Sequence, residues 1–148
     1  MFKTAVPATA DQNQSLQVDS SDRDQRASTP PVGWIGVDLD GTLAEFHHWE
    51  GIFRIGDPVP RMLERVKAWL LEGKDVRIFT ARVSPGQSPF AIMTARLAIR
   101  HWCQRHLGQS LPATATKDFS MIELWDDRAI GIIRNTGIRA DQVASGGA

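Results

Sequence analysis

The chain has 148 residues, 42% of them hydrophobic and 23% charged, which suits one domain with its own core and leaves too little for two. Seventeen basic residues balance seventeen acidic ones, and the zero net charge excludes a histone-like or polybasic membrane-binding protein. Cys103 is the single cysteine, so a disulfide framework is excluded and a cytoplasmic location is favoured. The sequence has no signal-peptide core and no run of about 18 apolar residues, and we expect no membrane association.

The N-terminal part differs in composition from the rest. From Ala8 to Pro31 the sequence is polar and small, and Leu16 and Val18 are its two large aliphatic residues. Such a stretch buries too little surface to offset the entropy lost on ordering. We predict a disordered tail over residues 1–32, with a partner-binding arm as the alternative, and a single domain over residues 33–148.

Strand and helix patterns alternate through that domain. Short apolar runs that end at polar residues predict strands, and apolar residues at helical spacing that end at glycine predict helices. The expected strands are Trp34–Val37, Val76–Phe79, Leu111–Thr116, Met121–Trp125 and, more weakly, Ile130–Ile133; the expected helices begin at Asp57-Pro58 and at Phe90 and end before Gly73 and Gly108. This alternation predicts an α/β fold with one doubly wound parallel sheet.

Several polar residues come directly after predicted strands, where such a fold gathers its ligands. Asp38 and Asp40 follow the first strand, and the others are Thr80, Lys117, Asp126 and Asp127. Crowded carboxylates repel one another unless a cation lies among them, and a set of oxygen ligands with room for water and phosphate suits Mg²⁺. The sequence therefore predicts a magnesium site.

The run Asp38-Leu39-Asp40-Gly41-Thr42-Leu43, followed in order by Thr80, Lys117 and Asp126-Asp127, resembles the four motifs of the haloacid dehalogenase-like phosphohydrolases. The resemblance spans about residues 34–135. It implies that Asp38 is the nucleophile, forming an aspartyl-phosphate, and that Asp40 is the acid/base. It also implies that Thr80, with the nearby backbone amides of Ala81 and Arg82, and Lys117 bind the phosphoryl group.

The same resemblance implies a metal site made by the Asp38 carboxylate, the Asp40 backbone carbonyl and Asp126, with Asp127 as a ligand or beside the ligands. Family members that pump ions have threonine where this chain has Asp40, so hydrolysis is favoured over ion pumping. Dehalogenases need neither magnesium nor this second aspartate. Receiver domains place their acidic pair first, whereas here a second pair closes the series.

The connections between motifs leave no room for a cap domain. The segment Leu43–Asp57, which we call the flap, has 15 residues, and the segment from Thr80 to Lys117 is largely helix. An uncapped site suits a phosphate on a large substrate, such as a nucleic-acid end or a phosphoprotein. Residues 76–117 contain no acidic residue. Arg96 and Arg100, one helical turn apart in this segment, form either an ordinary solvated helix face or a surface that binds a nucleic-acid phosphate backbone.

Arg82 is the arginine that we expect to contact the substrate phosphate, because guanidinium binds phosphate through two hydrogen bonds. Asp126-Asp127-Arg128 and the segment Gln142–Gly146 are similar to the end of the phosphatase half of phage polynucleotide kinase, whose kinase phosphate loop is absent here. The alternative to an enzyme is a catalytically silent protein of this fold that binds nucleic acid through its basic helix. His101, Cys103 and His106 lack a fourth ligand, and we expect packing, not metal binding.

Overall fold

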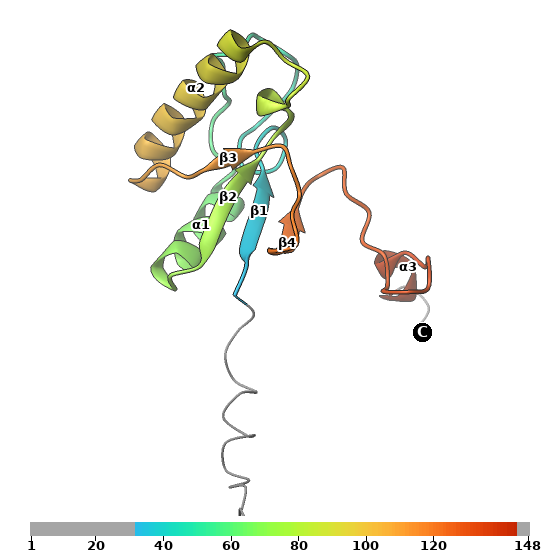
Figure 1. The fold of residues 1–148 in the computed structure, drawn as a ribbon. Helices are drawn as coiled ribbons and strands as arrows, with labels where there is room; N and C mark the ends of the chain where they lie inside the picture. The colour runs from blue at the N-terminus through green and yellow to red at the C-terminus, as the bar shows by residue number, and fades with distance from the viewer. Residues whose placement is uncertain (1–31, 145–148) are drawn as a thin grey trace, which may run out of the picture. The chain divides into compact units, whose positions relative to one another are not determined.

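The computed structural model describes residues 32–144 (Figure 1). The predicted disordered tail lies outside the described residues except for Val32, its last residue. The described part contains no helix long and apolar enough to cross a membrane.

Four parallel strands form one sheet in the order β3-β2-β1-β4 (Figure 1). The strands are β1 (Trp34–Asp38), β2 (Asp75–Phe79), β3 (Ala113–Thr114) and β4 (Met121–Trp125). β1 lies between two neighbours, and its first four residues are buried, as expected of an apolar run in a parallel sheet. The predicted parallel α/β class is confirmed.

The helices are α1 (Pro60–Leu71), α2 (Pro89–Leu107) and α3 (Ala140–Ala144), with a short 3₁₀ turn, η3 (Ala81–Val83), after β2. Ser88 caps α2 by accepting a hydrogen bond from the Ala91 amide, and Gly108 ends the helix in the left-handed conformation. Gly73 has the same conformation after α1, with φ +75°. The glycine stop signals are confirmed at both helices.

The predicted start of α1 at Asp57-Pro58 is wrong, because the helix begins at Pro60 with Val59 as its N-cap. The backbone of residues 57–59 pairs instead with the start of the flap. The Glu45 amide donates to the Asp57 carbonyl at 2.8 Å, and the Val59 amide donates to the Leu43 carbonyl at 2.9 Å. These hydrogen bonds fix the base of the flap against the entrance to α1.

A single apolar core joins the sheet to both long helices. Ile35 and Val37 from β1 and Val76 and Ile78 from β2 belong to it, together with residues of α1 (Met62, Val66, Trp69) and α2 (Ala95, Ile99, Trp102, Cys103). Both helices therefore pack on the same face of the sheet, and in the described part the link from β3 to β4 contains no helix. On the opposite face the Arg77 guanidinium covers the Trp34 ring at 4.7 Å.

Two groups of apolar residues are exposed. Met93 and Leu97 are 54% and 56% exposed on α2. The small residues Thr94 and Ala95 are buried on this helix. The expected fifth strand, Ile130–Ile133, is not formed; Ile132 makes one isolated bridge with Arg139.

Candidate metal and phosphoryl-transfer site

Three carboxylates meet at the carboxyl edge of the sheet. Asp38 is the last residue of β1, and the register pairs Val37 with Trp125, the last residue of β4. The next residues along β4 are Asp126 and Asp127, so the two adjacent strands deliver all three side chains to one place. One oxygen from each carboxylate lies within 4.8 Å of the others. We call Asp38, Asp126 and Asp127 the acidic cluster.

Asp38 has a higher proton affinity than an ordinary aspartate. The pKa of Asp38 is raised to about 7, first by burial and then by the negative charges of Asp126, Asp127 and Asp40. A hydrogen bond with Thr42 acts in the opposite direction. Crowding of this kind is relieved by a cation, and carboxylate oxygens are the donors that a hard divalent ion prefers. The residues therefore fit a metal ion.

The turn after β1 positions Asp127. The Thr42 hydroxyl donates to Asp127 Oδ1 at 3.4 Å and accepts a hydrogen bond from the Asp127 amide at 3.0 Å. Gly41 has φ +97°, and a Cβ atom at this position would lie 2.9 Å from Asp127 Oδ2. Only glycine satisfies both the left-handed backbone and the close approach of the carboxylate. Gly41 and Thr42 belong to the sequence motif, but the residue pattern gave neither of them this role.

Asp40 is held by Arg82 rather than placed in the acidic cluster. Both Asp40 oxygens accept hydrogen bonds from the guanidinium, with Nε to Oδ2 at 2.7 Å and Nη2 to Oδ1 at 2.8 Å. Arg82 is 5% exposed and also donates to the carbonyls of Ile52 and Arg54 in the flap. Arg82, which we expected to contact the substrate phosphate, is thus hydrogen-bonded to Asp40 and to the flap in this structure.

Thr80 directly follows β2 and is the N-cap of η3. Its hydroxyl accepts a hydrogen bond from the Arg82 amide at 3.2 Å, and its amide donates to the Thr114 carbonyl of β3 at 2.8 Å. Thr80 is buried, whereas Ala81 is exposed. The short helical turn thus fixes the Thr80 side chain at the sheet edge.

A cleft of about 370 Å³ contains most of these groups. It is lined by Asp38, Asp40, Phe46, Trp49, Phe79, Thr80, Ala81, Arg82, Gln87, Asp126, Asp127 and Arg128. Seven of the eight predicted site residues are therefore brought together. Lys117, the eighth, is exposed, follows β3 at the same edge of the sheet, and is not among the residues that line this cleft.

The cleft also contains residues that were not among the eight predicted site residues. Phe46 and Trp49 come from the flap, and Gln87 precedes α2 and donates to the Ala81 carbonyl at 2.9 Å. Trp49 lies over the Arg82 guanidinium at 4.8 Å. Phe46 lies in a segment without helix or strand, which offers no periodic signal, so the sequence could not assign it to the cleft.

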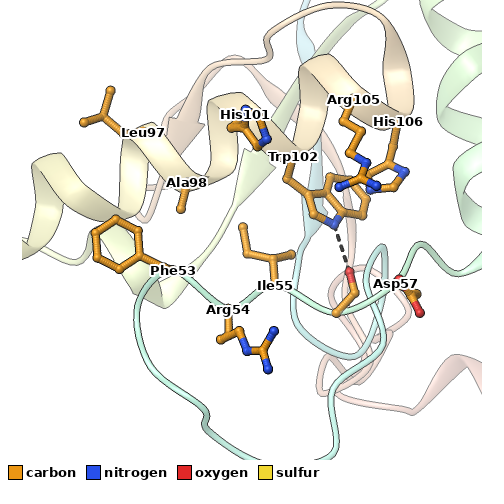
Figure 2. A pocket seen from close by; sticks show the side chains of 11 residues that line it. Phe53, Arg54, Ile55, Asp57, Leu97, Ala98, His101, Trp102, Arg105 and His106 are labelled. Carbon is orange, nitrogen blue, oxygen red and sulfur yellow. Dashed lines mark hydrogen bonds between the residues drawn. The ribbon is translucent and has the colours of Figure 1, made fainter.

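A second cavity, of about 470 Å³, lies between residues 53–57 and the C-terminal half of α2 (Figure 2). The Trp102 indole in its wall donates to the Gly56 carbonyl at 2.8 Å. Cys103 on the same helix is buried, and burial raises the pKa of its thiol to about 11. His101 is exposed, in contrast to Cys103, and these residues form no metal-binding group among those that the structure describes.

Comparisons with known proteins do not show a family for this chain. No family model matches the chain, and no curated protein matches it. A solved structure of a conserved protein from Bacteroides thetaiotaomicron is 24% identical and covers 69% of this chain and 81% of that chain, with a TM-score of 0.47. This likeness carries no functional argument, so membership of the haloacid dehalogenase-like family stays a prediction from the motifs.

Proposed function

We propose that the protein is a magnesium-dependent phosphatase that hydrolyses a phosphomonoester through an aspartyl-phosphate on Asp38. The observation that carries this proposal is the acidic cluster, in which Asp38, whose pKa is raised, lies beside two further carboxylates at the carboxyl edge of a parallel sheet. The residue order along the chain, which resembles that of the haloacid dehalogenase-like phosphohydrolases, gives each group its role.

The reaction proceeds in two displacements. In the first, a carboxylate oxygen of Asp38 forms a bond to phosphorus, the bond to the leaving oxygen breaks, and Asp40 gives that oxygen its proton. In the second, water attacks phosphorus, Asp40 takes the proton of the water, and the bond from Asp38 to phosphorus breaks. Free phosphate and the original carboxylate result, so the protein is unchanged after one turnover.

Magnesium, when bound, offsets the charge of the phosphoryl group as it approaches the carboxylates. Asp38, Asp126 and Asp127 would hold it, together with the Asp40 backbone carbonyl that the family resemblance implies. Thr80 and Ala81 line the cleft, and the Thr80 hydroxyl and the Ala81 amide would bind phosphoryl oxygens. Lys117, on the exposed segment after β3, would balance the remaining charge once a substrate is bound.

The substrate we favour is a phosphomonoester that is large or that needs open access to the cleft, such as a nucleotide or a nucleic-acid end. The connection from β1 to α1 contains no separate domain that would cover the cleft. Phe46, Trp49 and Arg128 line the cleft together with the reacting groups, and aromatic rings beside cations suit bases and phosphates. A panel of phosphorylated oligonucleotides, nucleotides, sugars and peptides tests this choice, and a clear preference for a small sugar phosphate would refute it.

Hydrolysis of an aryl phosphate, with and without Mg²⁺, tests the proposed activity itself. We expect activity that requires the ion and falls by at least about 1,000-fold in Asp38→Asn, because the amide cannot act as the nucleophile. Glu64→Gln, the same chemical change at an exposed position of α1, is the matched control and retains full activity. Activity that survives in Asp38→Asn would overturn the proposal.

A further inference from the structure

Arg82 is a buried arginine in a strand-end turn and uses most of its hydrogen-bonding capacity. Its side chain is 4% exposed, and its guanidinium makes four hydrogen bonds, two to Asp40 and two to flap carbonyls. An arginine has five N–H donors, so one remains. A guanidinium in this state lacks the paired free donors that would grip a phosphate.

The four hydrogen bonds join two parts of the site that are distant in sequence. Asp40 lies just after β1, whereas the carbonyls of Ile52 and Arg54 belong to the flap and lie 3.1 and 2.8 Å from the guanidinium. The ring of Trp49, also in the flap, lies against the guanidinium, with 4.8 Å between the guanidinium carbon and the ring centroid. Arg82 thus ties the middle of the flap to the proposed acid/base.

The base of the flap is fixed independently of Arg82. Trp102 of α2 donates to the Gly56 carbonyl at 2.8 Å, as Figure 2 shows, and the Glu45 amide donates to the Asp57 carbonyl at 2.8 Å. Loss of Arg82 would therefore release the middle of the flap while its two ends stay attached. This separation makes the contribution of Arg82 measurable.

The two hydrogen bonds from the Arg82 guanidinium have a direct consequence for the Asp40 carboxylate. Two parallel hydrogen bonds fix the plane of the carboxylate and leave the other lone pair of each oxygen for a proton. The charge of the guanidinium also offsets that of a carboxylate whose field raises the pKa of Asp38. Because the pair is only 4% and 20% exposed at its two side chains, solvent competes little with it.

We infer that Arg82 is a positioning residue that orients Asp40 for proton transfer and holds the flap over the cleft, and that it does not bind the substrate phosphate. This inference rests on the proposed function for its first half and on the contacts alone for its second half. The two halves have separate readouts.

The first readout is the dependence of rate on the leaving group. A poor leaving group such as phenol needs protonation, whereas 2,4-dinitrophenol leaves without it, so a displaced acid slows only the former. We expect Arg82→Gln to lower kcat for phenyl phosphate by about 100-fold and for dinitrophenyl phosphate by less than about fivefold. Asp40→Asn should give the same pattern, and the double variant should lose no more than Asp40→Asn alone.

Arg82→Lys separates the effect of the charge from that of the geometry, because lysine keeps the positive charge but cannot make the two parallel hydrogen bonds to Asp40. We expect it to resemble Arg82→Gln in leaving-group dependence. Wild-type rates in Arg82→Lys would overturn the positioning role. An increase in KM that is equal for both substrates, with kcat unchanged, would instead identify Arg82 as a phosphate ligand and overturn the inference.

The second readout needs no activity. Arg54 is exposed in the flap, and limited trypsin digestion followed by mass spectrometry measures cleavage after it. We expect Arg82→Gln to speed this cleavage at least about tenfold, because the flap opens more often. Arg61→Gln, which changes an exposed arginine of α1, is the matched control. Equal cleavage in Arg82→Gln and the control would overturn the flap role, even if the wild-type protein hydrolysed no phosphate.

Discussion

The Asp38 carboxyl makes the stability of the protein depend on pH. Its pKa is about 7 in the folded protein and 3.8 when unperturbed, chiefly because of burial and the neighbouring Asp126 and Asp127. Between these values the folded state binds more protons than the unfolded state. The contribution of Asp38 to the free energy of unfolding is therefore fully present below about pH 4 and is lost as the pH rises through 7. This sign is opposite to that of a carboxylate stabilised by a cation.

Thermal unfolding in the presence of a chelator tests this dependence for the Asp38 contribution. We expect the unfolding temperature of the wild-type protein to fall between pH 5 and pH 8 relative to that of Asp38→Asn, which has no carboxyl to titrate. At pH 8 the variant should be the more stable of the two, because one repulsive charge is removed. Parallel curves for the two proteins would contradict this assignment.

Added magnesium should reverse the order of stability. Ligand binding to the folded state raises stability, and protons compete with the ion for Asp38, so the gain should be larger at pH 8 than at pH 5. We expect the gain to vanish in Asp38→Asn. The same thermal measurement with a magnesium titration checks this, and an equal gain in both proteins would place the ion elsewhere.

Thr42 is the residue that fixes Asp127. Thr42→Val keeps the shape and removes both hydrogen bonds to Asp127, which should cost about 1 kcal/mol of stability and lower magnesium affinity by about tenfold. Isothermal titration with Mg²⁺ measures the affinity. Thr136→Val, in which a hydroxyl is lost outside the cleft, is the control, and an affinity loss no larger than in that control would contradict the role of Thr42.

At the level of elements, the Trp102 indole links α2 to the flap. Trp102→Phe keeps an aromatic ring in the core and removes the hydrogen bond to the Gly56 carbonyl, so we expect a loss of about 1–2 kcal/mol in denaturant unfolding. Hydrogen exchange should rise at the base of the flap, where the Glu45 and Val59 amides are bonded. Unchanged exchange at these amides would show that the flap does not depend on α2.

The elements that the sequence predicted well are those with a local signal at both ends. β1 ends at Asp38, β4 is followed directly by Asp126, and α2 lies between Ser88 and Gly108. The start of α1 was missed because the backbone of residues 57–59 is used by long-range pairing with the flap, which outweighs the local capping preference of Asp57. The buried face of α2 contains the small residues Thr94 and Ala95 beside Trp102 and Cys103, while Met93 and Leu97 are exposed.

At the level of the whole molecule, the sheet order explains the site. The order β3-β2-β1-β4 places the ends of β1 and β4 side by side, so Asp38 meets Asp126 and Asp127 although about 90 residues separate them. Polar residues at strand ends were enough to predict this convergence. They could not predict the pairing of Asp40 with Arg82, because that depends on how η3 and the flap fold over the sheet.

The most direct test of the account is chemical trapping of the proposed intermediate. The protein is mixed with an aryl phosphate and Mg²⁺, treated with borohydride, which reduces an aspartyl-phosphate to homoserine, and mapped by peptide mass spectrometry. We expect the reduced residue at position 38, and none when Mg²⁺ is withheld. Reduction at another carboxylate, or hydrolysis that proceeds with position 38 unmodified, would contradict the central role of Asp38.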